Sequence, residues 1–333
     1  MRHLLKNLFD LVFFKLEINM IFNKINLKIM RFAILLLSLS ITFPSLAQTN
    51  IKKVSKKEAA ARASILASNP TPYVIHDSEG NLVSFDKVIE ASLDADVVLF
   101  GELHDNPMVH WLQLLLTEAI DVEGQELVLG AEMFESDDQL PINEYLSGII
   151  NLSKLEDNAR VWPNFKTDYL PLLDYALEHD HKFIATNIPR RYASFVYNYG
   201  LDTLSTLSAE ALSFLPPLPI AYDASVGCYA DMLQMSGGHG GDNLPKSQAI
   251  KDATMAHFIS LNLPENGIFL HYHGAYHSQN KEGIAWYLYQ INPDLKIVTI
   301  SASEQDSIDN LGEESIGVAD FIITTPSNLT KTY

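Results

Sequence analysis

Residues 97–106 read VVLFGELHDN, an apolar run typical of a buried strand that is followed at once by glycine and by polar side chains. Two later segments repeat this arrangement: residues 127–134 read LVLGAEMF, and residues 268–277 read IFLHYHGAYH. Parallel strands bring their carboxyl ends to one edge of a sheet, which is where ligands bind in open α/β folds. The three segments therefore predict a single pocket of carboxylates and imidazoles.

The rest of the chain alternates between strand-like and helix-like segments, which indicates an α/β fold. We expect a mostly parallel central sheet flanked by helices. The stretch from about 139 to 262 is mainly helical in pattern, so we expect it to form a largely helical cap or side lobe. Strands are expected at 73–76, 82–84, 97–101, 127–131, 183–186, 268–272, 296–300 and 320–324, and helices at 107–121, 138–160, 171–178, 189–199, 206–215, 246–262 and 283–290.

Residues 1–47 are interpreted as an N-terminal extension followed by a signal peptide. Met30-Arg31 gives a short positive start, residues 32–41 are apolar apart from two serines, and Ser45-Leu46-Ala47 places small residues before a cleavage site after Ala47. The alternative is an N-terminal membrane anchor, but the apolar run is shorter than the roughly 20 residues that span a bilayer. Beyond the signal we expect a leading helix and linker over 48–72, a single α/β domain over 73–325 and a C-terminal tail over 326–333.

The charge and the cysteine content exclude several classes of protein. The 333 residues carry a formal net charge of −18, whereas a nucleic-acid partner needs a basic surface. Cys228 is the single cysteine, so disulfides, zinc thiolate clusters and iron–sulfur centres cannot form within one chain. No cysteine follows the apolar N-terminal run, so no lipoprotein attachment site is present. We therefore expect a periplasmic or secreted protein with no integral membrane span after cleavage, and with Cys228 as a buried thiol.

Glu102, His104, Glu132 and His277 are the candidate catalytic and metal-binding residues. Glu102 and His104 are two positions apart, so their side chains point the same way along an extended chain. The four side chains suit a divalent ion (zinc, manganese or iron) or, without a metal, a histidine base oriented by a carboxylate. Two alternatives stay open: a turn capped by Asp105 in which Glu102 and His104 are only solvated, and a Glu132 paired with a cationic side chain of a neighbouring helix.

Three imidazoles lie within seven residues, at His271, His273 and His277. If strand geometry continues, His271 and His273 share one face of the sheet. One or two of the three are expected to be hydrogen-bonded packing residues, with His277 as our first choice of ligand and His273 as the second. Asn187 follows another predicted strand and is placed to orient a substrate. The glycine-rich segment 236–242 is expected to be a flexible loop that covers the pocket.

Five motifs, in this order, resemble the ChaN-like family of bacterial haem-binding proteins, within the wider Tiki and erythromycin-esterase-like superfamily. The resemblance covers roughly residues 73 to 300, and no single motif is specific on its own. The motifs are Gly101-Glu102-Leu103-His104-Asp105-Asn106, Gly130-Ala131-Glu132-Met133-Phe134, Asn187-Ile188-Pro189-Arg190-Arg191, Gln248 with Asp252-Ala253-Thr254-Met255-Ala256, and Gly274-Ala275-Tyr276-His277.

The resemblance implies haem binding as the leading function. The protein would then act in haem or iron acquisition in the export compartment, and a homodimer is one expected form. Iron in haem accepts an axial histidine or tyrosine, and arginines pair with the propionates. The cofactor-binding candidates under this function are Tyr192, Tyr272, Tyr276 and His273, together with Arg190 and Arg191 for the propionates.

The resemblance also implies a second function, because superfamily relatives include metal-dependent hydrolases whose site matches Glu102, His104, Glu132 and His277. The ligand would then be a small-molecule substrate. A third interpretation is a hydrolase scaffold that binds a partner and catalyses nothing. The chain departs from the lipoprotein members of the family because it lacks their attachment cysteine. It also has His271-Tyr272-His273 in place of a plainer, glycine-rich approach to the last histidine.

Overall fold

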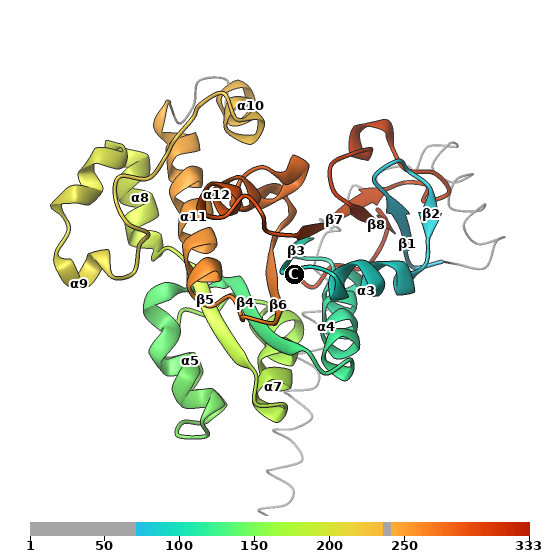
Figure 1. Ribbon diagram of the computed structural model, residues 1–333, viewed down its shortest axis with the longest axis horizontal. Helices are drawn as coiled ribbons and strands as arrows, with labels where there is room; N and C mark the ends of the chain where they lie inside the picture. Colours follow the sequence, from blue (N-terminus) through green and yellow to red (C-terminus); the bar gives the residue numbers. More distant parts are fainter. Residues whose placement is uncertain (1–70, 236–240) are drawn as a thin grey trace, which may run out of the picture. The chain divides into compact units, whose positions relative to one another are not determined.

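The computed structural model describes residues 71–235 and 241–333 of the chain (Figure 1). The expected signal peptide and leading helix lie outside the described residues, as does most of the glycine-rich loop. Within the described residues, no helix combines the length and the apolar character that a membrane crossing requires.

In the described part of the chain, one sheet of eight strands forms the centre of the fold, in the order β2-β1-β8-β7-β3-β6-β4-β5. The six strands from β8 to β5 are parallel to their neighbours, and only β1 is antiparallel to β2 and β8. This confirms the predicted mostly parallel sheet. The strands are β1 (Val74–Asp77), β2 (Leu82–Val83), β3 (Val97–Glu102), β4 (Glu126–Glu135), β5 (Lys182–Asn187), β6 (Gly267–Gly274), β7 (Ile297–Gln305) and β8 (Phe321–Pro326).

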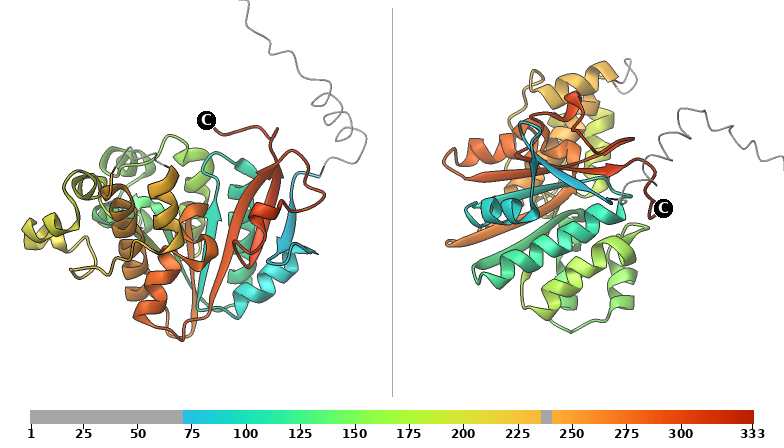
Figure 2. Two further views of the ribbon diagram at one scale, coloured as in Figure 1. Left: turned by 90° about the horizontal axis from the view of Figure 1, so that it is seen from above. Right: turned by 90° about the vertical axis from the view of Figure 1, so that its right-hand side faces the viewer.

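Helices connect the strands and cover both faces of the sheet (Figure 2). Short non-α turns complete several of the connections, including a π-helical turn at Phe165–Tyr169 and a 3₁₀ turn at Ala275–His277. The α-helices are α3 (Phe85–Leu93), α4 (Pro107–Val122), α5 (Gln139–Leu146), α6 (Leu152–Asn158), α7 (Leu170–Glu178), α8 (Arg190–Tyr199), α9 (Ala209–Leu212), α10 (Gly227–Met235), α11 (Asn243–Leu261) and α12 (Ile284–Ile291).

The alternation of side chains along β3 explains why both faces are covered. Val98 and Phe100 point into the core shared with α4 and α7, whereas Val97 and Leu99 point into the core shared with α11 and α12. All four side chains are fully buried. A strand that is apolar on both faces needs a layer of helices on each side, as parallel sheets usually have.

The segment between β4 and β6 is largely helical, as predicted, and its described residues contain one strand, β5. Helices α8 and α11 pack against each other through a small apolar core of their own. The members of this core are Ile188, Ala193, Val196, Leu204, Leu215 and Ile250.

Strand β5 lies at the edge of the sheet and is hydrogen-bonded to a side chain on its outer side. The amide nitrogen Nε2 of Gln139 donates to the carbonyl oxygen of Phe183 at 2.9 Å, and its Oε1 accepts from the backbone N–H of Ala185 at 2.7 Å. Gln139 thereby fills both hydrogen-bonding roles of a neighbouring strand.

Several boundaries differ from the sequence predictions for physical reasons. Strand β4 continues to Glu135 across a register shift in its pairing with β5, so Glu132 lies inside the strand and not beyond its end. Helix α3 was not predicted, although Phe85, Val88 and Ile89 have helical spacing. Helix α10 was also missed, because its glycine start and short length give a weak periodic signal.

Candidate functional site

The ends of β3, β4 and β6 lie side by side, because these three strands are neighbours in the sheet. Glu102 is in register with Gly274, whose backbone N–H donates to Oε2 of Glu132 at 2.8 Å. A Cβ atom at Gly274 would lie 2.8 Å from Nε2 of His104 and 3.6 Å from Oε2 of Glu132. The absence of a side chain at this glycine therefore lets the imidazole of His104 and the carboxylate of Glu132 approach the same point.

Glu102 is buried and holds His104 in place. Its Oε1 accepts hydrogen bonds from Nδ1 of His104 and from the hydroxyl of Tyr169, both at 2.8 Å, and its Oε2 accepts from Nε2 of Gln113 at 2.7 Å. Burial alone would raise the pKa of Glu102, but the hydrogen bond from His104 and the nearby charge of His110 hold that pKa below its usual range. The pairing expected from the two-residue spacing of Glu102 and His104 is thus present, and the capping role falls to Asn106 and not to Asp105.

Glu132 and His277 form a second buried pair. Nε2 of His277 lies 3.1 Å from Oε1 of Glu132, and its Nδ1 is hydrogen-bonded to Asp252, which also accepts from the hydroxyl of Tyr229 at 2.8 Å. Burial would lower the pKa of His277, but the two carboxylates on either side raise it to about 10. The same imidazole holds the pKa of Glu132 well below its usual range, against the effect of burial. Glu132 and His277 thus favour an ion pair at neutral pH, whereas burial raises the pKa of Asp252 on the other side of the imidazole.

A cavity of about 720 Å³ opens over these groups. The walls include three of the four candidate residues, His104, Glu132 and His277, while Glu102 lies behind His104. The side chain of His104 is 35% exposed, whereas that of His277 is 6% exposed. Other side chains that line the cavity are Trp162, Asn187, Arg190, Tyr197 and Lys251.

Asn187 is the last residue of β5, one position inside the strand that it was predicted to follow, and only one of the two polar atoms of its amide has a hydrogen-bonding partner among the described residues. Its Nδ2 donates to the carbonyl oxygen of Glu132 at 3.0 Å. Its Oδ1 is buried without a hydrogen-bonding partner among the described residues. A buried acceptor of this kind indicates a place for a donor group of a ligand.

Three residues of β6 that the sequence suggested do not line the cavity. His271 and His273 share one face, as predicted, but both are fully buried and bonded to each other, to Thr186 and to Ser278. Tyr272 points to the opposite face, where its hydroxyl is hydrogen-bonded to Thr117 at 2.5 Å. None of the three side chains therefore reaches a ligand in this cavity.

Of the remaining cofactor candidates, one lines the cavity and three do not. Arg190 lines the cavity. Arg191 instead binds Asp137 and stacks on the ring of Tyr192, and Tyr192 packs against the small core of α8 and α11. The hydroxyl of Tyr276 donates to the carbonyl oxygen of Cys228 at 2.6 Å, away from the cavity walls.

The residues that sequence reasoning missed lie mainly on helices. Lys251 is on α11 and Tyr197 on α8, and both follow helical spacing from other residues that line the cavity, Ser247 and Arg190. Asp252 is part of a family motif, but sequence reasoning assigned it no role in the site. Trp162 comes from the irregular segment after α6 and packs edge-on against His104, with 4.9 Å between the ring centroids. Nothing local in the sequence marks that tryptophan as a site residue.

The two buried histidines of β6 give a prediction for stability against pH. Burial lowers the pKa of His273 to about 3 and that of His271 well below 6.5. Below pH 6.5 the unfolded chain therefore binds protons that the folded chain does not, so we expect the free energy of unfolding to fall as pH drops from 6.5 toward 5. The expected slope is on the order of 1 kcal/mol per pH unit for each histidine.

Denaturant unfolding at several pH values between 7 and 5 measures this slope. This pH range lies above the usual pKa of carboxyl groups, so aspartate and glutamate side chains contribute little to the slope. His277 keeps its proton in the folded chain throughout this range, whereas the unfolded chain loses it near pH 6.5, so His277 opposes the slope near pH 7 and adds little to it between pH 5.5 and 5. The variant His271→Gln should flatten the dependence. Parallel stability curves for the two proteins would contradict the assignment.

Comparisons with known proteins agree with this architecture. A family model described as "Haem-binding uptake, Tiki superfamily, ChaN" matches residues 88–288. A solved structure of cofacial haem binding to ChaN of Campylobacter jejuni is 21% identical over 75% of this chain and 96% of that chain, with a TM-score of 0.57.

Two further solved structures share less. A mutant of the erythromycin esterase EreC in its open conformation is 11% identical over 75% of this chain and 82% of that one, with a TM-score of 0.40. The type III effector HopBA1 is 14% identical over 73% and 93% of the two chains, also with a TM-score of 0.40. No curated protein matches the chain.

The family model spans more than half of the sequence, and its matched segment contains all four residues Glu102, His104, Glu132 and His277. The chain belongs to the haem-binding ChaN family of the Tiki superfamily.

Proposed function

We propose that the protein binds haem in the cavity above β3, β4 and β6, and that His104 is the axial ligand. The observation that carries this proposal is the orientation of one imidazole. In the neutral form of His104, Nδ1 donates to the buried carboxylate of Glu102, which leaves Nε2 as the nitrogen with a free lone pair. The side chain is 35% exposed and lines the cavity, so an iron centre can reach this nitrogen from the solvent side.

The other walls of the cavity fit an amphipathic, dianionic ligand. Trp162 and Tyr197 offer aromatic surface, and Arg190 and Lys251 offer positive charge for two propionates. The volume of about 720 Å³ lies within the range of pockets that hold small molecules and cofactors. Haem iron bound here would supply a Lewis-acid centre that accepts the imidazole of His104. Glu102 would hold that imidazole in its orientation.

The proposal includes an exported protein that acts in haem or iron acquisition. It is supported by the signal-like sequence before Gln48, by the single cysteine and by the family description of haem uptake. The cavity is open to solvent on one side, where a second copy could contribute the opposite wall. A homodimer that encloses two haem groups face to face would resemble the cofacial arrangement of the Campylobacter protein.

A hemin titration of the chain from Gln48 onward, read by its visible spectrum, tests the proposal. We expect a saturable Soret shift at about one haem per chain, and a loss of affinity of about a hundredfold in His104→Ala, because a metal ligand and its orienting partner act together. The matched control is His257→Ala, which removes a half-buried histidine of α11 that does not line the cavity. Equal affinities of the His104→Ala and wild-type proteins would rule out the proposed ligand.

A second candidate function, metal-dependent hydrolysis, is favoured by the position of Glu132 between two imidazoles. Glu102, His104, Glu132 and His277 would hold the divalent ion, which would lower the pKa of a water molecule and polarise a carbonyl. His277 carries a proton at neutral pH in the absence of a metal, so it is a poor general base by itself, and an ion would have to replace that proton. Metal analysis and ester-hydrolysis assays on the same sample, with Glu132→Gln as the inactive control, distinguish this function from haem binding.

A further inference from the structure

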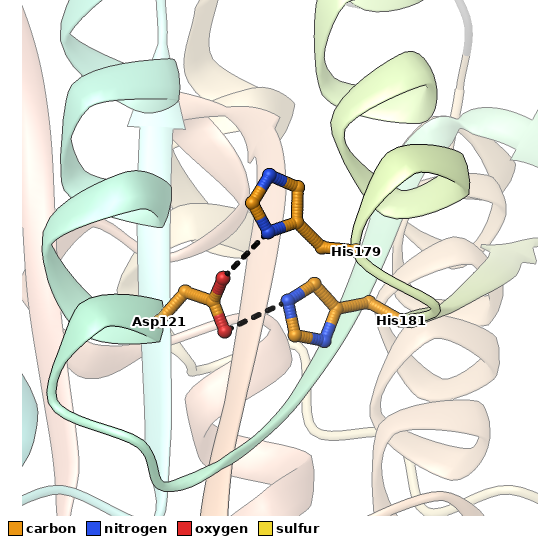
Figure 3. Close-up of side chains that lie close together, drawn as sticks. All are labelled: Asp121, His179 and His181. Atoms are coloured by element: carbon orange, nitrogen blue, oxygen red, sulfur yellow. Dashed lines mark ion pairs between the residues drawn. The ribbon is translucent and has the colours of Figure 1, made fainter.

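A second group of metal-ligating side chains lies at the opposite edge of the sheet. It consists of Asp121, His179 and His181, whose ligand atoms all lie within 4.8 Å of one another. Figure 3 shows both imidazoles pointing toward the carboxylate of Asp121. Helix α4 begins just after His104 and reaches Asp121 in its last turn, and its 16 residues correspond to about 24 Å. The group is therefore remote from the cavity that holds the candidate site.

The turn between α7 and β5 brings the two histidines together. His179 caps α7, Asp180 has a positive φ of 57°, and the N–H of His181 donates to the carbonyl oxygen of Ala176 at 2.9 Å. This is the 6→1 hydrogen bond of a Schellman helix ending, in which glycine usually occupies the left-handed position. The reversal of the chain at Asp180 directs both imidazoles toward the end of α4 (Figure 3).

The separations of the donor atoms match those of metal ligands. Nδ1 of His179 lies 3.2 Å from Oδ2 of Asp121, and Nε2 of His181 lies 3.0 Å from Oδ1. Ligand atoms around a tetrahedral zinc ion, with bonds of about 2.0 Å, are roughly 3.3 Å apart. The three side chains thus need only small movements to share one ion.

Two hydrogen-bonding details also favour a shared ion over a simple ion pair. Nε2 of His181 is buried and has no aligned hydrogen-bonding partner among the described residues, despite its close approach to Asp121. The hydroxyl of Tyr175 donates to Oδ2 of Asp121 at 2.7 Å and so helps to fix the orientation of the carboxylate. Partners of this kind commonly orient metal-binding carboxylates.

The surrounding charges favour a cation. Asp121 lies in the last turn of α4 and His179 at the end of α7, so the partial negative charges of two helix C-termini meet here. A carboxylate at a helix C-terminus is unfavourable without a positive partner, and neither helix has a basic residue in its last turn.

We propose that Asp121, His179 and His181 bind one divalent cation of the zinc type, with a fourth coordination position left to water or to an external ligand. Two imidazoles and one carboxylate suit zinc and its neighbours in the first transition series. The side chain of His179 is 43% exposed, so an ion can enter from solvent. The bound ion joins the end of α4 to the α7–β5 turn and stabilises that connection.

The test is a titration of untagged, full-length protein, stripped of metal, with Co²⁺ as the spectroscopic probe and Zn²⁺ as the competitor. We expect a saturable visible spectrum at about one ion per chain, and a loss of affinity of about tenfold or more in His181→Ala, Asp121→Asn and His179→Ala. Asp180→Gly is the matched control in the same turn, because glycine accepts the positive φ and no ligand is removed. Zinc should also raise the melting temperature of the wild type and of this control, but not of the ligand variants.

A second variant distinguishes this site from the cavity that Glu132 and His277 line. The double variant Glu132→Gln with His277→Ala removes ligands of the cavity site only, so it should retain the cobalt spectrum. A spectrum that disappears in that protein, or that is unchanged in His181→Ala and Asp121→Asn, would overturn the proposal. His179 is exposed, so its replacement tests the site even if the more buried variants fold poorly.

Discussion

Gly274→Ala is expected to abolish high-affinity hemin binding while the protein remains folded. The backbone at Gly274 is extended, with φ −60° and ψ 135°, so alanine fits the main chain without strain. Its Cβ, however, would lie 2.8 Å from Nε2 and 2.9 Å from Cε1 of His104. The half-exposed imidazole is the part that can move, so it should swing away from Glu132 and from the iron position.

The expected loss of hemin affinity is about that of His104→Ala, roughly a hundredfold. The free energy of unfolding should fall by only about 1–2 kcal/mol, because a single methyl group displaces a side chain that is free to enter solvent. The double variant Gly274→Ala with His104→Ala supplies the control. If alanine acts only through the displaced imidazole, the double variant should bind hemin no more weakly than His104→Ala alone. Additive losses would show that Gly274 acts through some other contact.

Gly101→Ala is expected to be far more damaging to the fold, although it also adds only one methyl group. Gly101 lies in β3 between β6 and β7, and its Cβ would lie 2.8 Å from Cα of Ala275 and 3.0 Å from the carbonyl oxygen of Ile300. Both neighbours are backbone atoms, one in β7 and one in the 3₁₀ turn directly after β6, so neither can rotate away. We expect the free energy of unfolding to fall by about 3 kcal/mol, measured by chemical denaturation.

Gly124→Ala is the matched control for this effect. Gly124 has a φ of 77° and no atom within 4 Å of its added Cβ, so its replacement costs only backbone strain, about 1 kcal/mol. Ala275→Gly should not rescue Gly101→Ala, because the nearest atom is Cα of Ala275 and not its Cβ. Equal destabilisation by the variants Gly101→Ala and Gly124→Ala would contradict the steric argument.

The position of the candidate site was predictable from the sequence, because it depends on strand order and on a period of two residues. Apolar runs followed by glutamate and histidine mark the carboxyl ends of β3, β4 and β6, and these strands are neighbours. The same period explains one error. Since His271 and His273 share a face, Tyr272 must point to the other face, and the structure shows it there.

The remaining parts of the site depend on how helices pack, which the sequence alone does not determine. Arg190 and Tyr197 share a face of α8, but only the contact of α8 with α11 turns this face toward the cavity and Tyr192 away from it. Asp252 is 120 residues from Glu132 in sequence and reaches the site because α11 crosses behind His277. The Asp121 group likewise joins a helix end to a turn that lies 58 residues later in the chain.

The hydrogen bonds of Gln139 to β5 have a consequence for self-association. An edge strand offers unpaired N–H and C=O groups on which an extended peptide or another copy of the chain can add a further strand, and such addition leads to aggregation. In this protein one amide side chain already occupies the carbonyl oxygen of Phe183 and the N–H of Ala185. Gln139 therefore disfavours templated strand addition at the β5 edge of the sheet.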